Sequence, residues 1–519
     1  MNIQTVLGKS GVPCILMVLA LGCGTVRPGA DYVRAGAMVK ARTGSDTVYN
    51  PELEATIKEK VGQFLDHGLT AQEAVRVALL NNRDFQSQFQ DIGVSRAEVV
   101  QSSLLTNPAI SLGARFPEGG GRSNLTFGLG QELVDLWQIP VRKRIAKARL
   151  DQAVMNVVQS AVELAARVKN AYYRLRVSQE STVAAQENVD LLRRMAQMAE
   201  RRFNAGESTI LDLNLVKSNI LDATIRLNSA RRDEEVDRVA FERLLGLSMD
   251  EAGVVRLTDP LTEQAEAVGD DKSLVEIALK SRLDVRTASL DIDAAAEEIK
   301  RQKRAIVPSL SLGIEAERTE RRAPRSLKPL PTDLPLPSPS QTLQDFVTQQ
   351  VEQGTAKDFI LQRYDAHRER ELEKRQNIDL LLGPSVQFTL PVWDQNKAQI
   401  AKARYEFAKK QKQYEELLLA VVQEVRQAAA TARSSAELLR LSAQEAVPLA
   451  EKNVGTAQRL YEAGEDTILA LLLAQQTLNE QRVSRIKFAG DYATALAELE
   501  QALGGTLNDM PREGTANMP

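Results

Sequence analysis

Apolar residues recur in this 519-residue chain at two different spacings, and the wider spacing, of three and four residues, predicts long helices. Over roughly 141–203 and 394–461 they alternate steps of four and three, the heptad spacing of helices that pack along their whole length. The first series is Leu150, Val154, Val157, Ala161, Leu164, Val168, Ala171 and Leu175, and the second is Leu418, Val422, Val425, Ala429, Ala432, Ala436, Leu439, Ala443, Ala446 and Ala450. At about 1.5 Å per residue, each stretch predicts a rod on the order of 90 Å. Pro448 predicts a local kink in the second rod.

The second spacing is strict alternation, which predicts four short β-strands at about 107–116, 123–131, 309–317 and 384–391. Each strand has one apolar face and one face of polar residues and glycine. Length and pattern fit membrane-spanning strands, which have about 9–11 residues with lipid on one side and water on the other. A sheet that lies with one face on a soluble core would show the same alternation.

A short phrase marks the end of each predicted rod. FNAGESTILDL begins at Phe203 and YEAGEDTILAL at Tyr461, and their glycines Gly206 and Gly464 lie 464 − 206 = 258 residues apart. Two later glycines, Gly246 and Gly504, have the same separation, so the intervening stretches have equal length. Because glycine accepts positive φ, each phrase predicts a helix reversal. Return helices are expected over 207–246 and 465–504.

These repeats divide the chain into two copies of one pattern. The first repeat covers 69–246 and opens with a helical segment at roughly 70–103; the second covers 271–504 and opens at roughly 271–304. An equatorial connection, 247–270, joins them. An insertion, 318–383, contains the proline-rich run KPLPTDLPLPSPS, and 505–519 is a tail.

The N-terminus predicts export. Lys9 precedes the apolar run VPCILMVLAL, which is too short to span a membrane and reads as a signal peptide over 1–22. Ala20-Leu21-Gly22-Cys23 resembles a lipoprotein cleavage box, so Cys23 is the expected lipid anchor, and 23–68 is expected to wrap the rest of the chain. Ordinary signal cleavage with an incidental Cys23 is the alternative.

Charge and composition exclude several classes of function. The net charge is −3, from 66 basic and 69 acidic residues spread along the chain, so no basic block indicates nucleic acid. Neither a phosphate-binding loop nor a GxSxG motif is present. His67 and His367 stand alone, without metal-ligand spacing. No catalytic residue, cofactor or metal site is therefore predicted, and the chain is not expected to be an enzyme.

Topology favours the membrane interpretation of the strands. In lipid a sheet can have no open edge, because each unpaired backbone group costs several kcal/mol. Four strands are too few for a barrel, since the smallest single-chain barrels have about eight. The strands must then be shared among copies of the chain, and three copies would supply twelve.

The duplicated phrases, the run NPAISL and the run GQELVDLWQIPVRKRIAKARL resemble the TolC-type outer-membrane efflux protein family over roughly 65–505. The resemblance implies a mainly α fold with a small β part. It implies a homotrimer with a shared 12-stranded β-barrel in the outer membrane and an α-barrel of coiled-coil hairpins reaching into the periplasm. It also implies two partners, a periplasmic adaptor and a proton-driven or ATP-driven inner-membrane pump.

The resemblance further implies roles for residues of the two phrases. The periplasmic tips, where the adaptor would dock, comprise Phe203, Gly206, Thr209, Asp212, Tyr461, Gly464, Asp466 and Thr467. Asp212, Ala470 and Leu473 would line the aperture, and the last two depart from the acidic residues of the best-known members. Tyr461 matches an aromatic residue of the closed-state latch, but its basic partner position holds Asp466.

The expected function is a passive exit duct for small molecules or metal ions. The alternatives are the outer-membrane channel of a type I protein secretion system and a non-conducting periplasmic scaffold lipoprotein. A periplasmic adaptor is disfavoured, because adaptors have one helical hairpin and this sequence has two.

Overall fold

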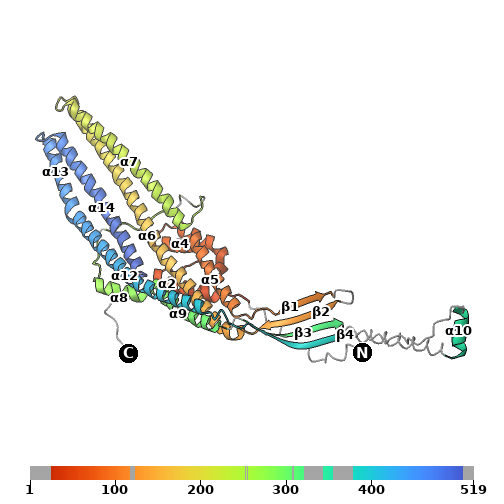
Figure 1. Cartoon of the computed structure of the whole chain (residues 1–519). Helices are drawn as coiled ribbons and strands as arrows, with labels where there is room; N and C mark the ends of the chain where they lie inside the picture. The colour runs from red at the N-terminus through yellow and green to blue at the C-terminus, as the bar shows by residue number, and fades with distance from the viewer. Residues whose placement is uncertain are drawn as a thin grey trace. The chain divides into compact units, whose positions relative to one another are not determined.

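The computed structural model of the chain describes residues 25–116, 123–249, 251, 253, 255–262, 264–306, 309–320, 343–354 and 378–506 (Figure 1). The chain divides into two compact units. Unit 1 comprises Met1–Ser103, Arg142–Lys300 and Ala398–Pro519, and unit 2 comprises Leu104–Val141 and Arg301–Lys397. The predicted signal peptide, Cys23, the proline-rich run and most of the C-terminal tail lie outside the described residues.

Unit 2 contains a four-stranded antiparallel sheet in the order β1-β2-β3-β4 (Figure 1). The strands are β1 (Ala109–Arg115), β2 (Asn124–Glu132), β3 (Leu310–Glu320) and β4 (Ile378–Phe388). The central pairing, β2 with β3, joins a strand of the first repeat to a strand of the second. Within the described residues, β1 and β4 each leave one edge unpaired.

The strand register places apolar residues on one face of the sheet and polar residues and glycine on the other. Leu112 lies opposite Phe127, which lies opposite Ala316, so apolar residues of neighbouring strands share one face. Ser111, Gly128 and Glu315 form the corresponding row on the other face. A shift of one residue in any pairing would mix the two faces, so the alternation in the sequence fixes the register.

The apolar face of this sheet is not covered by any other part of the chain that the structure describes. Leu112 is 79% exposed and Val386 is 62% exposed, and every residue of β1 is exposed. A sheet on a soluble core would bury this face. The expected alternative of a soluble-core sheet is therefore wrong for the described residues.

The fourth strand differs from its predicted range, 384–391. It begins at Ile378, six residues earlier, and β3 extends to Glu320, so the insertion between them is shorter than 318–383. The predicted start at Pro384 was wrong because proline is tolerated within an edge strand, and β4 is an edge strand of the sheet within one chain. Pro384 lies opposite Ile314 on β3, inside the strand. The insertion also contains α10 (Leu343–Glu352).

The helical segment that opens each repeat consists of two helices instead of one. The first repeat has α4 (Ala71–Asn81) and α5 (Arg83–Ser102), and the second has α8 (Asp271–Ser281) and α9 (Leu283–Arg304). The single residues between them, Asn82 and Arg282, have extended backbones with ψ of 119° and 131°. The two breaks are equivalent positions of the duplication.

Each break holds the end of the return helix of its own repeat. The side-chain amide of Asn82 donates to the carbonyl of Leu244 at 2.9 Å, and that of Asn81 donates to the carbonyl of Gly246 at 2.7 Å. In the second repeat, Arg282 Nη1 donates to the carbonyl of Ala502 at 3.1 Å. These bonds satisfy carbonyls that a helix C-terminus leaves without partners.

The N-terminal segment comprises α2 (Gly29–Thr43), the 3₁₀ turn η2 (Pro51–Thr56) and α3 (Ile57–Asp66). It packs against α5, where the rings of Tyr32 and Phe89 lie 5.7 Å apart and Arg96 pairs with Asp31. In the connection between the repeats, Leu257 bridges to Leu69, and Tyr172 donates to the carbonyl of Leu69 at 3.0 Å.

The long helices form two hairpins. The first is α6 (Asp135–Asn204) with α7 (Ile210–Leu245); the second is α12 (Lys397–Leu441), η3 (Ser442–Ala446) and α13 (Val447–Ala463) with α14 (Ile468–Leu503) (Figure 1). The first long helix begins six residues before the predicted start at 141. The second begins at Lys397, three residues after the predicted start at 394.

The residues before Pro448 form one π-helical turn, Ser442–Ala446. Buried positions on α12 follow steps of three and four through Ser435, Leu439 and Ser442, and the next buried position is Val447, a step of five. A π turn adds one residue to the helix, so it shifts the buried stripe by one position. The predicted series continued through Ala446, which the structure replaces with Val447.

None of the helices among the described residues combines the length and the apolar composition needed to cross a membrane. The same part of the chain holds no group of three His, Cys, Asp or Glu side chains that could bind a metal ion.

Candidate functional site: the paired helical turns

The first turn joins α6 to α7 through a left-handed residue. Gly206 has φ of 79°, and its N–H donates to the carbonyl of Phe203 at 2.9 Å while the N–H of Glu207 donates to that of Arg202 at 2.8 Å. Thr209 then begins the return helix with a capping box. Its Oγ1 accepts from the N–H of Asp212 at 3.2 Å, and the Asp212 carboxylate accepts from the N–H of Thr209 at 2.9 Å.

The second turn has the same backbone and a different cap. Gly464 has φ of 75°, and the N–H of Glu465 donates to the carbonyl of Leu460 at 2.9 Å. Thr467 Oγ1 accepts from the N–H of Ala470 at 3.4 Å. Ala470 occupies the position of Asp212 and has no carboxylate, and the N–H of Thr467 is instead satisfied by Asp466 at 2.7 Å.

The two turns lie against each other within unit 1 and share a core. Val189, Leu192, Met195, Ala199, Leu213 and Val216 of the first hairpin pack in one cluster with Tyr461, Ile468, Leu471 and Leu472 of the second. The duplicated phrases, 258 residues apart in sequence, therefore meet in space.

Arg202 links the two turns directly. Its guanidinium carbon lies 4.7 Å from the centre of the Tyr461 ring, and its Nη1 donates to the carbonyl of Tyr461 at 2.7 Å. The Tyr461 ring is buried, and its hydroxyl oxygen has no hydrogen-bond partner in the described structure. The interaction is thus between a cation and the ring face, and the hydroxyl takes no part in it.

Sequence reasoning missed Arg202. It expected the basic partner of Tyr461 at position 466, where the chain has Asp466, and left the latch chemistry open. The cation instead comes from the first repeat, at the last turn of α6. Arg202 lies 461 − 202 = 259 positions from Tyr461 in the sequence, but the two residues are adjacent in the fold. The only local signal was the pair Arg201-Arg202 at the end of a long helical pattern.

The comparisons with known proteins agree on one family. The family model described as "Outer membrane efflux protein" matches residues 74–247 and 274–505. The chain belongs to the outer membrane efflux protein family.

The toluene efflux pump outer membrane protein TtgC of Pseudomonas putida is 23% identical to the chain over 310 residues. That match covers 56% of this chain and 62% of TtgC, so the chain matches less than two thirds of its relative's length.

Solved structures with the same fold cover more of the chain. CusC superposes with a TM-score of 0.63 at 16% identity, over 84% of this chain and 92% of CusC. The CmeC outer membrane channel of Campylobacter jejuni gives 0.62 at 15% identity, over 84% and 85%. Members of the outer membrane efflux protein family are transporters rather than enzymes, and the family places the chain in the outer membrane.

The turn residues of this family member divide into exposed and packed groups. Gly206, Thr209, Gly464, Asp466 and Thr467 are exposed, and so are Phe203 and Leu473. Asp212 and Ala470 are half-buried, and Tyr461 is buried in the shared cluster. Further apolar residues missed by the sequence analysis are exposed beside the turns, namely Ile210, Leu211 and Leu469.

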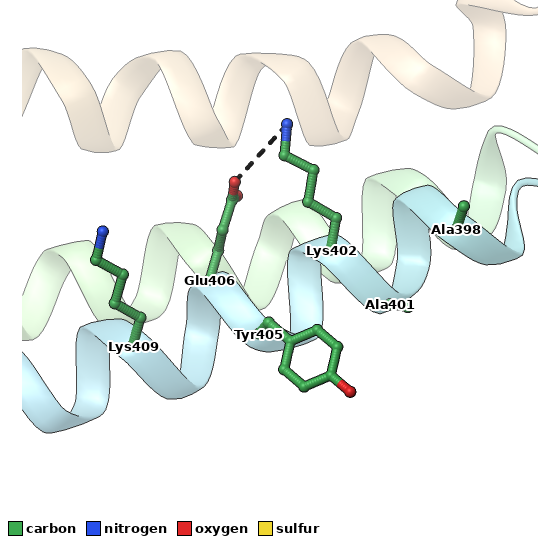
Figure 2. A pocket seen from close by; sticks show the side chains of 6 residues that line it. All are labelled: Ala398, Ala401, Lys402, Tyr405, Glu406 and Lys409. Carbon is green, nitrogen blue, oxygen red and sulfur yellow. Dashed lines mark ion pairs between the residues drawn. The ribbon is translucent and has the colours of Figure 1, made fainter.

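A groove runs along the first turns of α12. It has a volume of about 560 Å³ and is lined by Ala398, Ala401, Lys402, Tyr405, Glu406 and Lys409. Figure 2 shows these residues on one helix, with Lys402 and Glu406 forming an ion pair at 4.0 Å. Ala398, Ala401 and Tyr405 follow the three-four spacing of a coiled-coil seam. Tyr405 is 77% exposed, so this part of the seam has no partner among the described residues.

Proposed function

We propose that the protein is the outer-membrane exit duct of a tripartite efflux system, which conducts solutes passively from an inner-membrane pump and a periplasmic adaptor to the outside. The observation that carries this proposal is the sheet of unit 2. Its apolar face is exposed, its other face is polar, and both of its edges are open in the described chain. In a membrane barrel the apolar face would contact lipid and the polar face would contact water.

Further copies of the chain would close the sheet. Because successive strands are antiparallel, β1 and β4 run in opposite directions, so β4 of one copy can continue an antiparallel ladder with β1 of the next. Closure removes the edges that lipid cannot tolerate. Three copies of four strands would give a 12-stranded β-barrel, which exceeds the minimum of about eight.

The helices support the same assembly. The open groove on α12 has the small residues and the spacing that another helix would fill. On α7 the apolar residues Leu221, Ile225, Val236 and Val239 are also exposed. In a trimer these stripes would face neighbouring copies, and the hairpins would form an α-barrel that extends into the periplasm.

The two turns would form the periplasmic tips on which the adaptor docks. Ile210, Leu211 and Leu469 provide exposed apolar contacts beside Gly206 and Gly464. The substitution Ile210→Asp is expected to abolish efflux in cells while leaving the trimer and its bilayer conductance unchanged. Normal efflux by this variant would argue against docking at this position.

Asp212, Ala470 and Leu473 would line the aperture. The carboxylate of Asp212 accepts hydrogen bonds from the N–H and the hydroxyl of Thr209, and Ala470 and Leu473 carry no charge. We therefore propose a constriction of low charge. Divalent cations at low concentration should then block single channels weakly. Strong block would show an exposed acidic ring instead.

The cargo is proposed to be small molecules or metal ions, and the relative named for toluene efflux supports the first of these two classes. Cys23 is proposed to carry a lipid that anchors the N-terminus. Neither a catalytic group nor a cofactor enters the proposed mechanism, since energy would come from the pump.

The decisive experiment is to purify the full chain in detergent, measure its mass, and record conductance in planar lipid bilayers. A trimer with ion conductance is expected; a folded, non-conducting monomer would overturn the proposal. Leu112→Arg places a charge on the apolar face and should prevent insertion into the membrane. Burying an arginine on the lipid-facing side of a barrel costs about 2–4 kcal/mol near the bilayer midplane. Ser111→Arg, on the adjacent residue of the polar face, is the matched control and should insert normally.

A further inference from the structure

The two tryptophans of the chain follow the second strand of each repeat at the same distance in sequence. Trp137 follows the last residue of β2, Glu132, by 137 − 132 = 5 residues, and Trp393 follows the last residue of β4, Phe388, by 393 − 388 = 5 residues. Trp393 is 96% exposed, and Leu390 and Val392 beside it are exposed as well. Exposing such a large apolar ring to water is unfavourable, whereas the boundary between lipid and water favours the amphipathic ring of tryptophan.

A basic group lies between these tryptophans, within unit 2. The last turn of α9 supplies Arg301, Lys303 and Arg304, and Lys397 begins α12. Arg304 donates to the carbonyl of Trp137 at 3.4 Å, and Asn396 donates to the carbonyl of Gln302 at 2.7 Å. These two bonds hold the basic turn of α9 against both tryptophan segments.

The acidic residues nearby are engaged with the backbone. Asp135 is buried and accepts from the N–H of Thr106 at 2.6 Å, and Glu132 accepts from the N–H of Leu310 at 2.8 Å. Asp394 is exposed and accepts from the N–H of Asn396 at 2.8 Å. Three exposed cations, Lys303, Arg304 and Lys397, therefore face one exposed carboxylate among these residues, and their sum is positive.

Helix electrostatics explains only part of this charge. Basic residues stabilise a helix C-terminus through the helix dipole, which accounts for Arg301, Lys303 and Arg304 on α9. Lys397 lies at the N-terminal end of α12, where the dipole disfavours a cation. A ligand with negative charge would favour all four residues.

We propose that this surface, formed by Trp137, Trp393, Lys303, Arg304 and Lys397, binds the headgroups of anionic phospholipids. The inference rests on the proposed function, which places the strands in the outer membrane and the helical ends of β2 and β4 at its periplasmic leaflet. Trp393 sits at the level of the headgroups, and the cations contact lipid phosphates. The site then selects anionic phospholipid over zwitterionic lipid and fixes the depth of the barrel.

Tryptophan fluorescence tests both parts of this inference. The full-length variant Trp137→Phe, which keeps Trp393 as its single tryptophan, is reconstituted into vesicles of phosphatidylcholine and phosphatidylglycerol with bromine on one lipid at a time. Several-fold stronger relative binding of brominated phosphatidylglycerol at Trp393 is expected, and added salt should reduce the preference. The triple substitution Lys303→Gln, Arg304→Gln and Lys397→Gln should bring the ratio close to one.

The matched control removes three exposed charges that lie outside this surface and outside the α12 groove, Lys60→Gln, Lys452→Gln and Lys487→Gln, and should keep the preference. Equal quenching by the two brominated lipids in the Trp137→Phe protein would overturn the headgroup site and leave the membrane duct intact. The absence of quenching by either lipid would instead contradict the placement of the strands in a bilayer, and with it the proposed function.

Discussion

At the scale of single residues, the contact between Arg202 and Tyr461 defines the turn region. It joins residues 461 − 202 = 259 positions apart, and it combines a cation over a ring with a hydrogen bond to a backbone carbonyl. The Tyr461 hydroxyl is buried without a partner. An unsatisfied buried hydroxyl destabilises by about 1–3 kcal/mol, so this atom contributes nothing favourable to the packing of the two turns.

The two functions of the tyrosine side chain can be separated by substitution. Tyr461→Phe keeps the ring under Arg202 and removes the unpaired hydroxyl, so the turns should be as stable as before or more stable by up to about 3 kcal/mol. Tyr461→Leu removes the ring and should cost about 0.5–2 kcal/mol. Hydrogen exchange at the backbone amides of 461–468 reports both effects. Faster exchange in the phenylalanine variant would show that the hydroxyl has a partner in the assembled protein.

At the scale of elements, the duplicated hairpins use glycine for two different purposes. Gly206 turns the chain in open space, with no atom near its missing Cβ, and requires glycine only for its positive φ. Gly246 also has positive φ, and a Cβ there would lie 2.5 Å from the carbonyl oxygen of Asn81. The end of the return helix therefore depends on close packing against the break between α4 and α5.

Alanine at these two glycines should have unequal effects. Gly206→Ala should cost about 1–2 kcal/mol, the strain of a left-handed residue with a side chain. Gly246→Ala adds a clash with backbone that cannot move away easily, so its loss of stability should be clearly larger. Thermal unfolding followed by circular dichroism would compare the two variants. Equal melting temperatures would contradict the packing argument.

The cap of α4 predicts a pH dependence. The N–H and the hydroxyl of Thr70 donate to Glu73, and these bonds lower the pKa of the Glu73 carboxyl from its usual 4.5. A lowered folded-state pKa stabilises the fold at pH values above the unfolded pKa, and this contribution is lost as the pH falls through the folded-state value. Glu73→Gln keeps the shape of the cap and removes the titration.

The stability difference between the native chain and Glu73→Gln should accordingly be constant near neutral pH and shrink at pH values below 4.5. Denaturant titrations at several pH values would measure it. A difference that stays unchanged down to the acid limit of the fold would show that the carboxylate has no special role in this cap.

At the scale of the whole molecule, the sheet of unit 2 is incomplete by itself. Its open edges are β1 and β4, which run antiparallel to each other, and its apolar face has no cover in the described chain. Repetition of the same sheet around a closed barrel would pair the open edges and would turn the uncovered apolar faces outward, toward lipid.

Chemical cross-linking between copies tests this closure. A chain with both Ser111→Cys on β1 and Gln387→Cys on β4, treated in membranes with a short bifunctional thiol reagent, should give covalent dimers and trimers on denaturing gels. Each single variant should give few cross-links, because the barrel brings β1 of one copy next to β4 of another. Cross-linking that stays within one chain would mean that the sheet closes on itself.

The sequence by itself determined every feature that has a local period. Alternation predicted that four strands exist and which of their residues share a face, although it placed the start of β4 six residues too late. Heptads predicted the long helices, and Gly206 and Gly464 predicted the reversals. These predictions succeed because side-chain direction along a helix or strand follows directly from residue spacing.

Tertiary structure alone decided the features that depend on distant partners. The pairing of β2 with β3, the passage of β4 through Pro384, the π turn before Val447 and the meeting of Arg202 with Tyr461 leave no periodic trace in the chain. Each depends on which surfaces come together after the two repeats have folded. Packing selects such contacts among many that local spacing permits equally, so only the folded arrangement identifies them.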